Sequence, residues 1–325
     1  MRLLNNWIPP LGALAAALAV CLPPAVPAAR AQQPSGAVFR AETRLVVLHA
    51  SVVDKKGKLI TNLPRKAFTV YENDVKQEIK IFRREDVPVS MGLIIDNSGS
   101  MRDKRQQVES AALALVEASN PEDEVFIVNF NDEAYLDVDF TSDIKKMEEG
   151  LTRIDSRGGT AMRDALSMSI DHLVENAKKD KKVLLVITDG NDNTSAVTLE
   201  KLVHKAQQAE VLIYAIGLLN QEQRRERKRA KRALDAITKA SGGLAYYPDD
   251  VSEVHDIALR VAHEIRNQYV IAYSPTNPAL DGSYRRIRVE VKAKGNPKVR
   301  TRSGYYASPL KPGKSRLTEV TSTGE

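Results

Sequence analysis

Three short segments of small polar residues could bind a metal ion. They are DNSGS at 96–100, GGT at 158–160 and TDG at 188–190. Together they supply carboxylate and hydroxyl oxygens, which are the ligands that a hard cation such as Mg²⁺ takes in octahedral geometry. The first segment alone would also suit an ordinary helix cap, since Asp and Ser are favoured there. All three together favour a site for a divalent cation.

Two of the three segments follow apolar strands. Residues 91–95 and 183–188 are almost continuously apolar, which predicts parallel strands that are covered on both faces. Ligands of open α/β sheets bind beyond the carboxyl ends of the strands, where these loops would lie. The GGT segment opens a helix predicted from residue 161. The side chains that we expect to converge at this edge are Asp96, Ser98, Ser100, Thr160 and Asp189.

The elements that would position these loops alternate between strands and helices. Further strands are predicted at 125–130, 211–217 and 244–247. Helices are predicted near residues 108–118, 161–177, 198–209, 230–240 and 251–266. Because such alternation is typical of an α/β fold, we predict a doubly wound, mainly parallel sheet over residues 86–266.

Both flanks of this domain carry strand patterns. The first, residues 38–85, includes an alternating stretch at 75–81, and the second, residues 267–307, begins with a strand at 269–273. Neither flank would bury enough apolar area to fold alone without disulfides. We therefore predict that they are two parts of one β-sandwich in which the α/β domain is inserted. The tail, residues 308–325, is expected to be disordered.

The order of DNSGS, GGT and TDG resembles the von Willebrand factor A domain, whose metal-ion-dependent adhesion site combines a DxSxS loop with a distal threonine and a distal aspartate. The resemblance covers residues 86–266. It implies that Ser98 and Ser100 bind the metal directly, Thr160 directly in the ligand-ready state, and Asp96 and Asp189 mainly through waters. The layout also looks like the secreted, acidobacterial-type family of von Willebrand A-related bacterial proteins, which has no settled activity.

A dication whose direct protein ligands are neutral can accept a carboxylate from a partner protein's Asp or Glu at its open position. We therefore expect a metal-dependent adhesion or assembly module that uses Mg²⁺, with Mn²⁺ or Ca²⁺ as possible replacements, and no catalysis. A metal-dependent hydrolase of an unknown extracellular substrate is the alternative. The five histidines, in the first flank and in predicted helices, argue against it. An ion that only steadies the fold is a third interpretation.

The first 31 residues are typical of a signal peptide, with Arg2 before an apolar stretch at 11–22 and small residues up to Ala31. This stretch is shorter than the roughly 20 residues that a transmembrane helix needs. We do not expect a lipid anchor at Cys21, because bulky Val20 precedes it. The protein is therefore expected to be exported, either to the periplasm or further out.

The net charge of +6 depends on one segment, residues 222–232, which holds seven Lys or Arg residues and two Glu. We interpret Arg224 to Arg232 as a solvated helix face, with anion binding as the alternative. Nucleic acid is not expected as a partner, because no aromatic residues alternate with these cations. The sequence leaves open the partner, the choice of metal, the oligomeric state and the role of the basic segment.

Overall fold

A computed structural model of the protein describes residues 45–84, 86–152, 157–190 and 192–308. All of these described residues lie in the same compact unit. The predicted signal peptide with Cys21, and the predicted tail beyond Ser308, lie outside the described residues. Within the described ranges, no helix is both long and apolar enough to cross a membrane.

A six-stranded sheet forms the centre of the α/β domain, in the order β10-β9-β8-β5-β6-β7. Its strands are β5 (Val89–Asp96), β6 (Glu124–Phe130), β7 (Ala134–Thr141), β8 (Lys181–Thr188), β9 (Leu212–Gly217) and β10 (Ala245–Tyr246). Neighbouring strands are parallel except for β7, which runs antiparallel to β6 at the sheet edge. The predicted mainly parallel sheet is thus confirmed.

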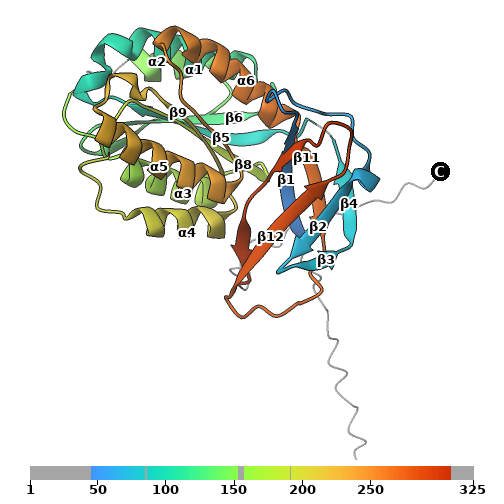
Figure 1. Cartoon of the computed structure of the whole chain (residues 1–325). Helices are drawn as coiled ribbons and strands as arrows, with labels where there is room; N and C mark the ends of the chain where they lie inside the picture. The colour runs from blue at the N-terminus through green and yellow to red at the C-terminus, as the bar shows by residue number, and fades with distance from the viewer. Residues whose placement is uncertain (1–44, 85, 153–156, 191, 309–325) are drawn as a thin grey trace, which may run out of the picture. The chain divides into compact units, whose positions relative to one another are not determined.

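Helices cover both faces of this sheet (Figure 1). One face packs against α1 (Arg105–Glu117), α2 (Ile144–Thr152) and α6 (Val254–Arg266). The other packs against α3 (Met162–Asn176), α4 (Leu199–Ala209) and α5 (Arg224–Ser241). The central strands are therefore buried on both sides, which explains why their sequences are apolar without alternation.

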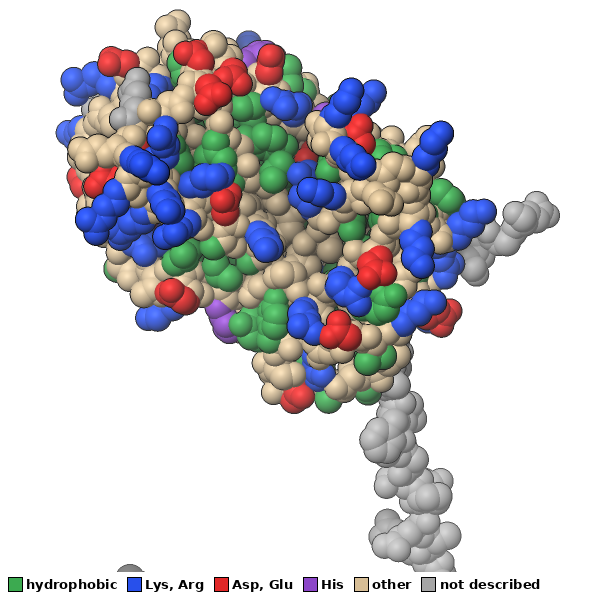
Figure 2. Space-filling view, viewed as in Figure 1, with side chains coloured by type: hydrophobic (Ala, Val, Ile, Leu, Met, Phe, Trp, Pro, Cys, Tyr) green, Lys and Arg blue, Asp and Glu red, His purple; other side chains and the backbone are tan. Residues whose placement is uncertain are grey.

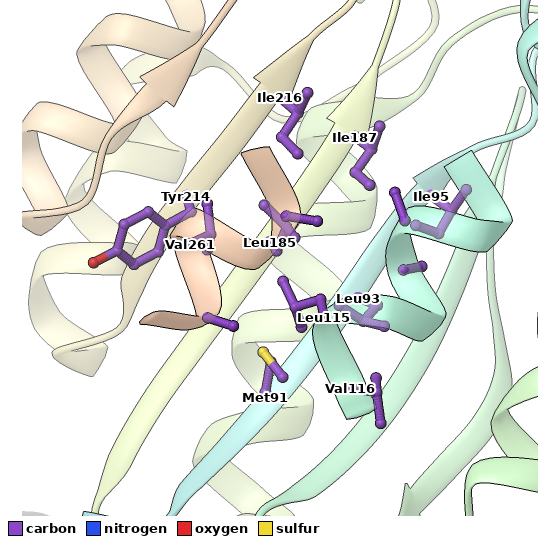
Figure 3. Close-up of a cluster of buried hydrophobic side chains, with 14 of the residues drawn as sticks. Met91, Leu93, Ile95, Leu115, Val116, Leu185, Ile187, Tyr214, Ile216 and Val261 are labelled. Carbon is purple, nitrogen blue, oxygen red and sulfur yellow. The ribbon is translucent and has the colours of Figure 1, made fainter. Parts of the chain in front are cut away.

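The side chains of β5 alternate between the two hydrophobic cores. Figure 3 shows Met91, Leu93 and Ile95 on one face of the sheet, where Leu93 lies near Leu115 of α1. Ile94 belongs to the core on the opposite face. Both sides of β5 are filled, so the position of Asp96 at its end is fixed by packing along the whole strand.

Three features of the α/β domain differ from the sequence-based expectation. The helix predicted at 230–240 begins earlier, at Arg224. The sequence pattern missed its first six residues because all of them are exposed and show no apolar periodicity. Strand β7 and helix α2 were not predicted. The residues of β7 are all at least partly exposed, so its strand pattern is weak.

Strands from both flanks pair with each other in two further sheets, ordered β13-β1-β11-β4 and β14-β12-β2-β3. The strands are β1 (Val46–Val53), β2 (Phe68–Glu72), β3 (Val75–Gln77), β4 (Ile79–Arg83), β11 (Tyr269–Tyr273), β12 (Tyr284–Val291), β13 (Lys298–Arg300) and β14 (Gly304–Tyr306). The alternating stretch at 75–81 falls in two strands, because the chain changes sheet between β3 and β4. The division of the chain into separate domains stays a prediction.

A buried carboxylate joins the flanking strands to the α/β domain. Glu264 of α6 accepts hydrogen bonds from Ser51 Oγ of β1 at 2.8 Å and from Tyr214 of β9 at 3.2 Å. Tyr246 also donates to it, at 3.3 Å, and Arg300 of β13 forms an ion pair with it at 2.7 Å. Four partners from four strands therefore depend on one side chain.

Replacing Glu264 with Gln should lower the free energy of unfolding by about 2–4 kcal/mol, because Arg300 would lose the charge that compensates its partial burial. Urea denaturation followed by circular dichroism measures this change. The exposed Glu148→Gln on α2 is the matched control, with an expected effect below about 0.5 kcal/mol. Equal effects of both changes would show that the junction contributes no specific stability.

Candidate metal centre

The candidate centre lies where the strand order of the central sheet reverses. The chain leaves β5 towards β6 on one side and later returns to the other side of β5 with β8. The loops after β5 and β8 therefore diverge. The carboxyl ends of these two strands border the kind of crevice in which α/β proteins bind ligands. Asp96 is the last residue of β5 and Thr188 the last residue of the neighbouring β8.

Asp96 is only 1% exposed, and both of its carboxylate oxygens accept hydrogen bonds. Thr188 Oγ1 donates to Oδ2 at 2.5 Å, and the backbone N–H of Ser98 donates to Oδ1 at 2.8 Å. Burial raises the pKa of Asp96 to about 6, although the hydrogen bonds from Ser98 and Thr188 oppose this rise. The negative charge of Asp189 raises it further. Asp96 is thus a carboxylate held in place by two hydrogen bonds, and a nearby cation would stabilise its charged form.

Two serines connect Asp96 to the loop after β8. The Oγ atoms of Ser98 and Ser100 lie 3.2 Å apart, and Ser100 Oγ donates to Asp189 Oδ1 at 2.8 Å. Ser98 is extended and precedes the 3₁₀ helix η2 (Gly99–Lys104), so the chain turns immediately after it. The structure therefore brings two hydroxyls and one carboxylate together within hydrogen-bonding distance.

Backbone hydrogen bonds hold the loop of Thr160 against this cluster. Gly99 N donates to Gly158 O at 3.3 Å, and Arg157 N donates to Asn97 O at 3.0 Å. Gly158 has a φ of +76°, a conformation that glycine adopts readily. A Cβ placed on Gly190 would lie 3.7 Å from Thr160 Oγ1. Thr160 is therefore beside the loop of Asp189.

Polar side chains also form hydrogen bonds with the backbone of this loop. Asn193 Oδ1 accepts the backbone N–H of Thr160 at 2.9 Å, and Asp132 Oδ1 accepts that of Gly159 at 2.8 Å. Asp192 is paired with Arg163 at 2.9 Å and accepts the hydroxyl of Ser195. These groups position the loop.

Lys104 is the feature that sequence reasoning missed. Its Nζ forms a buried ion pair with Asp189 Oδ2 and lies 3.4 Å from the backbone oxygen of Ser100. The side chain is only 10% exposed. Its place four residues after Ser100, about one helical turn, was a signal that it could point back to the loop. An ammonium group thus neutralises the carboxylate that a metal ion would use.

The donors at this edge are hydroxyls as much as carboxylates. Among the described residues, no group of three or more His, Cys, Asp or Glu side chains is placed to hold a metal ion. A metal here would depend on serine and threonine oxygens, which suit a hard cation. Two of the histidines pack against aromatic rings instead, His172 against Phe126 and Phe140, and His204 against Tyr306.

Comparison with known sequences identifies the domain that carries this site. Residues 91–191 match the sequence profile of the von Willebrand factor type A domain. The chain is 24% identical over 211 residues to inter-alpha-trypsin inhibitor heavy chain H4 of Bos taurus, a match that covers 59% of this chain and 22% of that protein. It is 23% identical over 175 residues to an uncharacterized Synechocystis protein, covering 51% and 39%. The chain therefore spans about a fifth to two fifths of these relatives.

Solved structures that match part of this chain include a von Willebrand factor type A protein from Catenulispora acidiphila. Its TM-score is 0.48 at 14% identity, and the alignment covers 80% of this chain and 73% of that one. Proximal thread matrix protein 1 from the mussel byssus has a TM-score of 0.47 at 18% identity, with 56% and 48% covered. The profile match begins in β5 and ends just after Gly190. The loops of the candidate centre thus lie within it, and residues 91–191 belong to a von Willebrand factor type A domain.

Proposed function

We propose that this protein is an exported binding module for adhesion or assembly, which uses a divalent cation to hold a carboxylate of a partner protein. The observation that carries the proposal is the convergence of Ser98, Ser100 and Asp189 at the carboxyl edge of the sheet. Export, to the periplasm or beyond, rests on the signal-peptide pattern of residues 1–31. The resemblance to the secreted acidobacterial-type family agrees with it.

The residues that would hold the cation are Asp96, Ser98, Ser100, Thr160 and Asp189. Their oxygens fit a hard ion, and Mg²⁺ is the ion that we propose, with Mn²⁺ or Ca²⁺ as replacements. When bound, such an ion supplies an electrophilic position at which a partner's Asp or Glu can coordinate. The buried Asp96, fixed by Thr188, orients the loop that carries both serines.

Lys104 would set how readily the cation enters. In the structure its ammonium group already neutralises Asp189, so an incoming ion must compete with this ion pair. A released ammonium group beside the site would add a second positive charge for the partner's carboxylate. The chain's own residues thus provide both the binding oxygens and a competing charge.

Two alternatives remain testable. A metal-dependent hydrolase would need a general base near the cation. Among the described residues, His172 and His263 hydrogen-bond with Asn176 and Asn267, away from the candidate centre. If the ion only steadied the fold, its removal would lower the melting temperature and leave every interaction of the protein unchanged.

Ser98→Ala should weaken Mn²⁺ binding by on the order of 100-fold, because a hydroxyl of the cluster is removed. Isothermal titration calorimetry measures the affinity. The exposed Ser110→Ala on α1 is the matched control and should bind as the wild type does.

The same variants test the grip on a partner. Proteins from a cell-envelope extract that bind the immobilised chain in Mg²⁺ should be lost in EDTA, with Asp96→Ala and with Ser98→Ala, and should be retained with Ser110→Ala. Mass spectrometry identifies them. If the partner proteins were retained in EDTA, or by both site variants, metal-dependent partner binding would be ruled out.

Lys104→Met should tighten Mn²⁺ binding by about tenfold or more, because the competing charge-assisted hydrogen bond to Asp189 is removed. The variant should also melt below the wild type in EDTA, since Asp189 is then a buried charge without its ion pair, and should recover with Mn²⁺. Arg102→Met, an exposed cation in the same 3₁₀ helix, is the control. Unchanged Mn²⁺ affinity of Lys104→Met would contradict the competition.

A further inference from the structure

The N-terminal half of α5 presents an exposed row of cations. Every Lys and Arg residue between Arg224 and Arg232 is exposed, while Ala230, Leu234 and Ile237 face the core. Six of the cations lie about 100° or more from Ala230 around the helix axis, and one of them, Lys231, is paired with Asp235. We call the other five residues the basic face: Arg224, Arg225, Lys228, Arg229 and Arg232. Figure 2 shows Lys and Arg side chains gathered over the region of α5.

The basic face lowers the stability of its own helix. Arg224, Lys228 and Arg232 follow one another at i,i+4 spacing, as do Arg225 and Arg229, and like charges at this spacing repel. Cations near a helix N-terminus are also opposed by the macrodipole. Among the described residues, Lys231 is the one cation of the segment that forms an ion pair, at 3.4 Å to Asp235.

The glutamates of the segment do not compensate these charges. In the described part of the chain, neither Glu222 nor Glu226 forms an ion pair with the basic face. The basic face thus lowers the stability of the helix, and no acidic side chain of the described residues compensates its charges. A surface that binds a negatively charged partner would show this property. The arginines suit carboxylates, since a guanidinium group can bind both oxygens of a carboxylate at once.

The basic face begins beside the candidate metal centre. After β9, Leu218 N donates to Thr188 O at 2.8 Å, and the 3₁₀ helix η3 (Leu219–Gln221) then leads to Glu222 and α5. Burial raises the pKa of Glu222, and the negative charge of Asp189 raises it further, while Lys104 opposes the rise. Glu222 is therefore within electrostatic reach of the site, and α5 runs away from it.

We propose that the metal centre and the basic face form one surface, and that its partner is an acidic protein segment in which further Asp or Glu residues flank the coordinating carboxylate. This inference rests on the proposed function. From Arg224 to Arg232 a helix rises about 12 Å, which an extended peptide covers with about four residues. The flanking acidic residues should therefore lie within roughly four to six positions of the coordinating one.

The charge pattern favours an acidic protein segment over nucleic acid or lipid. The proposed metal centre accepts a carboxylate, and a protein segment can present several carboxylates in a row. No aromatic residue lies between Arg224 and Arg232 to stack on bases. Anionic vesicles and single-stranded DNA therefore serve as competing ligands in the test.

Two fluorescent ten-residue peptides test the proposal with the full chain. One has a single Asp in a Gly-Ser background, and the other has the same Asp followed by four Glu. Fluorescence anisotropy in Mg²⁺ should show the acidic peptide binding about tenfold tighter or more, since several exposed ion pairs each add little but act together. This difference should shrink at high salt.

The triple variant Arg224→Gln, Arg225→Gln, Lys228→Gln should lose the tenfold advantage of the acidic peptide. Its Mn²⁺ affinity should stay unchanged, and its melting temperature should not fall, because like-charge repulsion is relieved. The control variant Lys55→Gln, Lys56→Gln, Lys58→Gln makes the same change in net charge on an exposed turn far along the chain, and should bind as the wild type does.

Four results would overturn the inference. The first three are an unchanged preference for the acidic peptide in the triple variant, an equal loss in the control variant, and binding of phosphatidylglycerol vesicles or DNA without binding of the acidic peptide. If the wild type did not bind Mn²⁺, the proposed function itself would be refuted. Acidic-peptide binding that persists fully in EDTA would show that the two surfaces act separately, which also contradicts the inference.

Discussion

The hydrogen bond between Thr188 and Asp96 joins the ends of two neighbouring strands, and the candidate centre depends on it. Asp96 is buried, so its carboxylate could not stay in place without partners for both oxygens. Thr188 supplies one partner from β8, and the backbone of Ser98 supplies the other. Since the same carboxylate fixes the turn after β5, the two serines are positioned by a residue that sits beneath them.

The reversal of strand order supplies the room for this arrangement. Because β6 and β8 lie on opposite sides of β5, the connections that leave the carboxyl ends of β5 and β8 separate over the sheet. The loop of Thr160 enters the space between them and is held there by Asn97, Gly99 and Asn193. The site is thus assembled from three connections, each braced by hydrogen bonds to the others.

Much of this was predictable from residue types alone. Apolar strands followed by DNSGS and TDG indicated the edge at which the polar residues would meet, and Ser98, Ser100 and Asp189 do meet there. Lys104 was not predicted, because strand and helix periodicity do not show where a long flexible side chain ends. The strand β7 was missed because an edge strand carries little apolar pattern.

The pairing of the flanks constrains how the chain reaches its final form. Strand β1 is bonded to β11 and β13, so partners for residues 46–53 come from residues 269–300, more than two hundred positions later. Loop closure over such a separation is slow. The α/β domain can complete its own sheet first. Until β11 and β13 pair with it, β1 has unpaired edges that can pair with a strand of another molecule of this protein.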